Sequence, residues 1–176
     1  WALNLRWLWL KKTQPERPWA DFLFKVHSNV KALFSASVHT TVGDGSRTLF
    51  WTDRWIHGQS ISVLAPTLVS HITVGIKKSR SVQEALVNNR WVNDISGSLS
   101  AQIIIDFLVI WDLVQGFQLH PGTPDVHRWS PSASGDYSTK SAYDRFMAGS
   151  VSFEPATRIW KSWAPQGVNS SFGWLL

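Results

Sequence analysis

The stretch that decides the fold runs from residue 38 to residue 51 and reads VHTTVGDGSRTLFW. Its first five residues are mostly β-branched, which favours an extended strand. Gly43-Asp44-Gly45-Ser46 follows as a turn sequence, and Thr48-Leu49-Phe50-Trp51 then returns to residues that favour strands. An Asp-Gly pair between two such runs is typical of a β-hairpin. We therefore predict a hairpin over residues 38–51.

A second hairpin is predicted further along the chain. Val126-His127-Arg128-Trp129 and Asp136-Tyr137-Ser138 favour strands, and residues 130–135 between them are Ser, Pro, Ala and Gly. Such a segment between two strand formers is typical of a hairpin loop. A hairpin needs a packed face to be stable, so tryptophans beside it are expected in the core. These tryptophans are Trp51, Trp55 and Trp129.

Much of the remaining chain favours helices. Ser81-Val82-Gln83-Glu84 has the arrangement of a capping box, in which the serine and glutamate side chains each accept an amide N–H at a helix start. Ser100 and Gly116 are suitable caps for the apolar segment between them. The predicted helices span residues 19–35, 82–87, 101–115, 139–148 and 155–163. Residues 59–80, with Pro66 and scattered serines, are expected to be irregular.

These elements together predict an α+β fold, a small irregular module that is mostly helical with two short β-hairpins. Three regions follow one another: an aromatic and basic segment with a helix at 1–36, a hairpin with a helical linker at 37–125, and a third region at 126–176. The chain starts with Trp1 rather than Met and ends in Phe172-Gly173-Trp174-Leu175-Leu176. Native termini are usually polar, so we expect a piece of a longer protein.

Composition excludes several classes of protein. Of the 176 residues, 44% are hydrophobic and 16% are charged, which is unlike an intrinsically disordered chain. Cysteine is absent, so disulfides, thiolate zinc sites and cysteine nucleophiles are ruled out. The longest apolar run, at residues 103–111, contains Asp106 and is too short to cross a membrane. We expect no membrane partner, and the lack of a visible secretory signal favours an intracellular protein.

Aromatic and basic residues are interleaved in two places, as in proteins that bind nucleic acid. The chain has 12 tryptophans and a net charge of +5, and the basic excess is concentrated in residues 1–31. Exposed tryptophan can stack on bases while lysine and arginine hold phosphates, so RNA or DNA is the expected partner. The candidate binding residues are Arg6, Trp7, Trp9, Lys11, Lys12, Arg17 and Arg54. The alternatives are that the charge serves solubility and that the tryptophans belong to the core.

The acidic and imidazole side chains form no recognisable catalytic pattern. The candidate carboxylates for metal-assisted chemistry are Asp44, Asp53, Asp106, Asp112 and Asp136. Those in predicted turns are explained by bonds to nearby amides, and the two on one helix point to different faces. Asp53 can pair with Arg54 or cap a turn. Because the six histidines also lack zinc-site spacing, we predict neither an enzyme nor a bound metal or cofactor.

Several segments together resemble one family. The more specific ones are Gly43-Asp44-Gly45 with Phe50-Trp51-Thr52-Asp53-Arg54-Trp55, and Ser134-Gly135-Asp136-Tyr137-Ser138 with Ser141-Ala142-Tyr143. Weaker matches lie at residues 5–10, 17–19, 64–66, 90–92, 159–161 and 163–165. Their order and spacing over nearly the whole chain are similar to the region downstream of the polymerase core in plant non-LTR (LINE-type) retrotransposon reverse transcriptases. That region leads into the reverse-transcriptase zinc-binding domain.

The resemblance implies a non-catalytic linker that touches template nucleic acid and has the polymerase domain of a parent polyprotein as its neighbour. Residues 126–176 would be the start of the zinc-binding-like region, truncated before any zinc ligands. The chain departs from the family because it lacks the polymerase's paired catalytic aspartates and because residues 166–171, usually basic, read QGVNSS. Two other functions are considered: an independent nucleic-acid-binding module, and a structural fragment that packs against partner domains.

Overall fold

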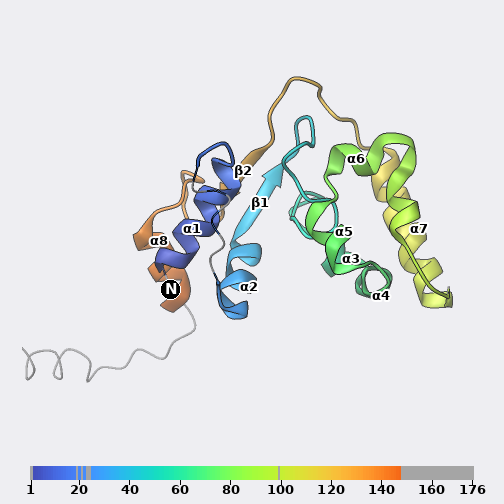
Figure 1. Ribbon diagram of the computed structural model, residues 1–176, viewed down its shortest axis with the longest axis horizontal. Coiled ribbons are helices and arrows are strands. Elements are labelled where there is room, and N and C mark those ends of the chain that lie inside the picture. Colours follow the sequence, from blue (N-terminus) through green and yellow to red (C-terminus); the bar gives the residue numbers. More distant parts are fainter. Residues whose placement is uncertain (1, 19, 21, 23–24, 99, 148–176) are drawn as a thin grey trace, which may run out of the picture. The chain divides into compact units, whose positions relative to one another are not determined.

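The computed structural model describes residues 2–18, 20, 22, 25–98 and 100–147 (Figure 1). Contacts divide the chain into two units, Trp1–Arg145 and Phe146–Leu176, and the described residues of the second unit are Phe146 and Met147. The described residues form eight α-helices, one 3-10 helix and a two-stranded antiparallel sheet, which confirms the α+β, mostly helical class. The helix predicted at 155–163 lies outside the described residues.

The elements follow one another in a simple order. Helices α1 (Ala2–Thr13) and α2 (Ser28–Ser37) precede strand β1 (Val38–Thr41), and strand β2 (Val126–Trp129) precedes helix α8 (Thr139–Met147). The intervening elements are α3 (Ile61–Leu64), α4 (Pro66–Ser70), α5 (Val74–Ser79), α6 (Val82–Leu86), the 3-10 helix η1 (Val87–Asp94) and α7 (Ala101–Gln115). We call residues 42–125, which connect the two strands, the helical lobe. None of the described helices is both long and apolar enough to span a membrane.

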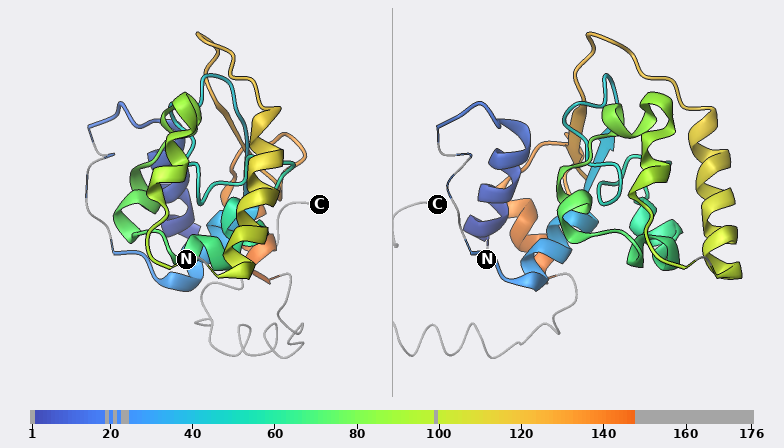
Figure 2. Two further views of the ribbon diagram at one scale, coloured as in Figure 1. Left: turned by 90° about the vertical axis from the view of Figure 1, so that its right-hand side faces the viewer. Right: turned by 45° about the vertical axis from the view of Figure 1, so that its right-hand side comes forward.

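The sheet corrects the prediction of two hairpins. Strands β1 and β2 pair with each other, with Val38 opposite Trp129 and Thr41 opposite Val126, and they lie side by side in Figures 1 and 2. Each predicted hairpin therefore contributed one strand to a shared sheet. The expected return strand at 48–51 is bend and turn except for Leu49, which forms an isolated bridge with Ser81, and residues 136–138 are irregular. Both turn sequences are real, but neither brings its flanking segments together as a ladder.

A buried carboxylate explains why the Gly-Asp-Gly sequence does not form a hairpin turn. Asp125 accepts hydrogen bonds from the amides of Gly43 (2.8 Å), Gly45 (2.9 Å) and Arg47 (3.0 Å) and from the Thr48 hydroxyl (2.7 Å). Because these amides and this hydroxyl are bonded to Asp125, they are not available to pair within a hairpin. The bonds connect the first residues of the helical lobe to its last residue. A Cβ at Gly43 would lie 2.1 Å from the carbonyl oxygen of Thr123, so only glycine fits there.

Two helical segments differ from the prediction. The helix expected at 19–35 begins at Ser28, because His27 has extended backbone and its imidazole accepts the amide of Asn29. Val26 is buried although it precedes the helix, and its four-residue spacing from Val30 resembled a helical pattern. Residues 59–80, expected to be irregular, contain three short helices: Pro66 occupies the first turn of α4, and Thr73 caps α5. Proline is well tolerated at that first position because no N–H is needed there.

The helices with the clearest caps were predicted correctly. Ser81 and Glu84 form both hydrogen bonds of the capping box at the start of α6. Helix α7 starts after Ser100, whose hydroxyl accepts the amide of Ile103, and ends at Gly116. Helix α8 closely matches the prediction at 139–148.

Two hydrophobic clusters stabilise the described fold. The larger one lies within the helical lobe and includes Phe50, Trp51, Trp55 and Trp91. The smaller one joins residues on both sides of the lobe in sequence; its buried members are Leu5, Val26, Val30, Val38, Trp129 and Ala142. Trp51, Trp55 and Trp129 are all buried, which confirms their predicted place in the core. Each such aromatic side chain buries on the order of 150–250 Å² and contributes strongly to stability.

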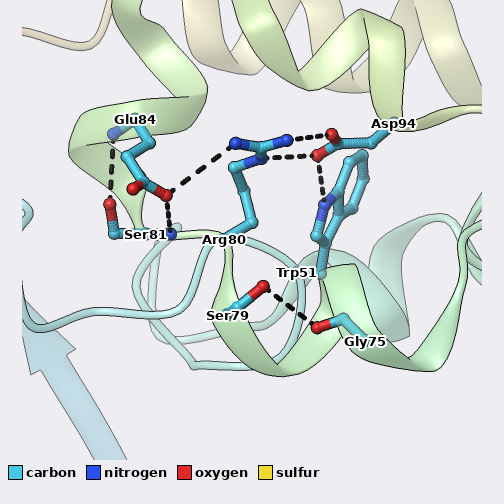
Figure 3. A network of polar contacts seen from close by, with 7 residues as sticks. All are labelled: Trp51, Gly75, Ser79, Arg80, Ser81, Glu84 and Asp94. Carbon is cyan, nitrogen blue, oxygen red and sulfur yellow. Dashed lines mark hydrogen bonds and ion pairs between the residues drawn. The ribbon is translucent and has the colours of Figure 1, made fainter.

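One ionic cluster is enclosed in the helical lobe (Figure 3). The Asp94 carboxylate, on a residue only 3% exposed, accepts from Arg80 Nε at 3.0 Å, from Arg80 Nη2 at 2.5 Å and from Trp51 Nε1 at 3.1 Å. The hydrogen bond to Asp94 raises the pKa of Arg80. Glu84 lies 3.8 Å from the same guanidinium on a more exposed side. The cluster links η1 to the residue that ends α5.

Candidate nucleic-acid interface

Helices α1, α2 and α5 and the loops at 46–53 line an open cavity of about 710 Å³, which we call the basic groove. Among the residues that the structure describes, five basic side chains line it: Lys11, Lys12, Lys31, Arg47 and Lys78. Asp53 is the acidic residue among these described lining residues. Aromatic rings of Trp7, Phe22 and Phe34 lie along the same walls. Proteins that bind single-stranded nucleic acid combine cations, which contact phosphates, with aromatic rings on which bases stack.

Local structure explains where most of these cations sit. Lys11 and Lys12 are in the last turn of α1, and Lys78 is in the last turn of α5. A helix C-terminus carries partial negative charge, so lysine is favoured there. Lys31 lies in α2, and Arg47 lies in the loop whose amides bind Asp125. The position of each cation thus follows from the helix or loop that carries it.

The cations of the basic groove differ in how far they are already neutralised. Lys12 Nζ lies 2.5 Å from Asp53 Oδ2, and Asp53 also accepts the amide of Leu49. Arg47 lies 4.0 Å from Glu16 in an exposed pair, which contributes little. Lys11, Lys31 and Lys78 are exposed and form no ion pair with any other residue that the structure describes. These three, with Arg47, give the groove its excess positive charge.

The two tryptophans of α1 that the sequence left open have different environments. Trp9 packs against Trp129 and Tyr137, with ring centroids 6.3 Å apart in both pairs, so it belongs to the smaller core. Trp7 is half-buried, meets Phe22 edge to face and lines the basic groove. The structure therefore keeps Trp7 as a candidate for base contact and assigns Trp9 to packing.

The predicted arginines do not line the basic groove. Arg54 holds the fold, because its guanidinium donates to the carbonyl oxygens of Gly58 and Ala36. Arg6 is exposed on α1, and Arg17 is exposed beyond its end. Of the seven predicted residues, the groove brings together Trp7, Lys11 and Lys12.

Sequence reasoning missed Lys31, Arg47 and Lys78 as site residues. They come from three separate segments, and the signal was weak: a net basic charge over residues 1–31 and a basic cluster at residues 77–80. Their convergence depends on tertiary packing. No spacing rule along the chain would select them.

Three of the five carboxylates considered for metal chemistry, Asp44, Asp53 and Asp106, have structural partners. Asp44 accepts the amide and hydroxyl of Ser46, as expected for a turn. Asp106 is buried and accepts the amide of Leu68 and the side chain of Gln102. Within the part of the chain that the structure describes, no three His, Asp or Glu side chains lie close enough to hold a metal ion.

His127 is a half-buried histidine on β2 near the basic groove. Its Nδ1 lies 2.9 Å from the Thr40 hydroxyl, and its Nε2 is buried with no described hydrogen-bond partner. The pKa of His127 is lowered to about 4, chiefly by burial and also by the nearby charge of Lys12, while Asp53 opposes the change. The imidazole is therefore neutral in the folded protein at neutral pH.

Because the pKa of His127 is lowered, we expect the free energy of unfolding to decrease in mild acid. In the unfolded chain this imidazole binds a proton near the ordinary pKa of about 6.5, whereas in the folded chain it does so only near pH 4. The stabilisation from the neutral imidazole is therefore fully present above about pH 6.5 and is lost as the pH falls towards 4. Allowing for solvent screening of a partly exposed ring, the free energy of unfolding should drop by about 1.5 kcal/mol between about pH 7 and about pH 5. Urea unfolding measures it. His127→Gln should flatten this dependence and His39→Gln should retain it; an unchanged slope in His127→Gln would contradict the assignment.

Comparison with known proteins assigns no family to this chain. No family model, no curated protein and no solved structure matched it.

Proposed function

We propose that this chain is a non-catalytic module that holds the phosphate backbone of RNA or DNA in the basic groove. The observation that carries the proposal is the set of exposed cations, Lys11, Lys31, Arg47 and Lys78, gathered around one cavity with an aromatic wall. Lysine and arginine side chains that neutralise phosphates release counterions and provide sequence-independent affinity. The carboxylates nearby are used in ion pairs, caps and turns, which supports a binding role over turnover.

The resemblance to plant non-LTR retrotransposon reverse transcriptases gives this role a setting. We propose that the module belongs to the region between the polymerase core and the zinc-binding domain of such a polyprotein. There the basic groove would contact the template, and the polymerase domain would be the neighbouring partner. Polymerase or nuclease activity from the purified chain would contradict the non-catalytic part of the proposal.

The test is a salt titration of binding to a fluorescein-labelled single-stranded RNA, followed by anisotropy. If four cations contact phosphates, the Kd should rise roughly 50-fold between about 50 and about 200 mM salt, because each contact adds about 0.7 to the slope of log affinity against log salt. Lys31→Gln with Lys78→Gln should lower that slope by about 1.4. Both positions are exposed, so the fold should be retained.

A matched control removes the same charge elsewhere. Arg90 and Lys140 are exposed and do not line the basic groove, so Arg90→Gln with Lys140→Gln should leave the slope almost unchanged. Equal effects of the two double variants would mean that net charge, not the groove, drives binding. If polyglutamate displaced the labelled RNA as effectively as unlabelled RNA does, the basic groove would be a general anion site. Failure to bind RNA or DNA even at about 50 mM salt would contradict the proposal.

Such a failure would favour the structural alternative, for which one surface is notable. Helix α7 buries Ile103, Ile110 and Val114, yet its other side is also apolar. The exposed apolar residues of α7 are Ile104, Ile105, Leu108 and Val109. A helix that is apolar on all sides is usually covered on all sides.

A further inference from the structure

A second cavity opens on the outer face of α1, and we propose that it receives an unstacked base of a single-stranded nucleic acid whose phosphates lie in the basic groove. This inference rests on the proposed function and specifies its substrate: single strands with bases, rather than any polyanion or a duplex. We call this cavity the base pocket. Its lining residues, among those that the structure describes, are Leu3, Asn4, Arg6, Trp7, Leu10 and Phe22.

The base pocket is built from one stripe of α1. Leu3, Arg6, Trp7 and Leu10 are spaced three and four residues apart, so they share a face of the helix. The opposite side of α1 carries Leu5, which is fully buried in the smaller core. The stripe is thus held in place by packing that does not involve it. Its cavity of about 430 Å³ falls within the usual range of small-molecule sites, about 300–1,000 Å³.

The chemistry of the lining suits a base. Apolar side chains predominate among the described lining residues, and Leu3 and Phe22 are 76% and 64% exposed. A base has apolar faces that stack on aromatic rings and polar edges that hydrogen-bond. Asn4 offers both a donor and an acceptor, and Arg6 offers donors or a stacking plane. None of the described lining residues is acidic, so phosphate is not repelled.

Continuity with the basic groove identifies the occupant. Trp7 and Phe22 line both cavities, and their rings meet edge to face with centroids 6.1 Å apart. One turn further along α1, Lys11 lines the groove side. A strand whose phosphates contact Lys11 would place an adjacent base beside the Trp7 ring. Paired bases are enclosed within a duplex and could not enter, so the arrangement favours single strands.

The experiment uses the full 176-residue chain and three labelled oligonucleotides of equal length: an all-thymidine strand, an abasic strand with the same phosphates, and a duplex. The thymidine strand should bind about 10-fold more tightly than the abasic strand, since stacking on an aromatic ring is worth on the order of this factor per base. Trp7→Leu should abolish that difference while the abasic strand still binds. The matched control is Trp111→Leu, which alters another half-buried tryptophan outside both cavities.

Each result has a distinct meaning. Salt-dependent binding that is equal for the thymidine and abasic strands would overturn the base pocket and leave the basic groove intact. A base preference that survives in Trp7→Leu, or tighter binding of the duplex, would also overturn it. If none of the oligonucleotides binds, the proposed function itself has failed. Because the strands are compared first on the unaltered chain, the base preference is decided there even if the Trp7→Leu variant does not fold.

Discussion

Replacing Asp94 by alanine should reduce the free energy of unfolding by about 3–5 kcal/mol, the usual cost of breaking a buried ion pair by removing one partner. The change leaves the Arg80 guanidinium without its principal acceptor and the Trp51 indole N–H without its partner (Figure 3). The indole N–H would then be buried without its acceptor, and the guanidinium would keep only the more exposed Glu84 at 3.8 Å. Urea unfolding followed by circular dichroism measures the loss. Because Arg80 ends α5, the position of Lys78 in the basic groove should be affected too.

Two further variants separate the buried pair from its exposed neighbour. Glu84→Gln removes the charge 3.8 Å from Arg80 on a side chain that is 52% exposed, so it should cost less than about 1 kcal/mol. The double variant Arg80→Met with Asp94→Leu should recover much of the loss, since an apolar pair of similar volume often replaces a buried ion pair. A loss below about 1 kcal/mol in Asp94→Ala would show that this cluster does not stabilise the lobe.

Asp125→Asn is expected to destabilise the protein by about 3 kcal/mol, because the amide group has donors where the fold supplies only donors. Four hydrogen bonds converge on this carboxylate, from Gly43, Gly45, Arg47 and Thr48. Burial raises its pKa, but these bonds together outweigh burial and lower the pKa below the ordinary value of 3.8. A lowered folded pKa means that this stabilisation is present above that value and is lost as the pH falls below it.

The matched control for Asp125 is Asp44, in the same loop. Among the described residues its carboxylate accepts from Ser46 alone, and it is more exposed than Asp125, so Asp44→Asn should cost less than about 1 kcal/mol. Equal costs for the two variants would mean that Asp125 does not close the neck of the helical lobe. Arg47 follows the Gly-Asp-Gly segment directly, so Asp125→Asn should also weaken RNA binding, whereas Asp44→Asn should not.

The candidate site was foreseen only where it lies on one helix. Trp7, Lys11 and Lys12 are close in the sequence, and interleaved aromatic and basic residues drew attention to them. Arg54 had the same local signal, yet its guanidinium is bound to two backbone carbonyl oxygens. Whether a cation is available for phosphate depends on its neighbours in space. Local spacing carries no such information.

Short-range chemistry was sufficient for elements whose signals lie within a few residues. The Ser81 capping box and the caps of α7 at Ser100 and Gly116 followed from side chains and their immediate neighbours. Trp51 and Trp129 are buried as predicted, but the two hairpins from which their burial was argued are not the pairing that the structure shows. Helix caps act over three or four residues, so the sequence displays them directly. The same holds for the α+β class, which follows from the periodicity of the segments.

Strand pairing and the shape of the basic groove depend on residues far apart. Thr40 and His127 face each other across the sheet although they are 87 positions apart, and either strand could locally have formed a hairpin. The Asp125 carboxylate takes the amides that a hairpin turn would have arranged otherwise, and packing of both strands into one core favours the distant pairing. Pairing between distant strands is possible because the entropic cost of closing a loop rises only slowly with its length. Which strands pair is therefore decided by the free energy of the whole fold and not by the sequence around one turn.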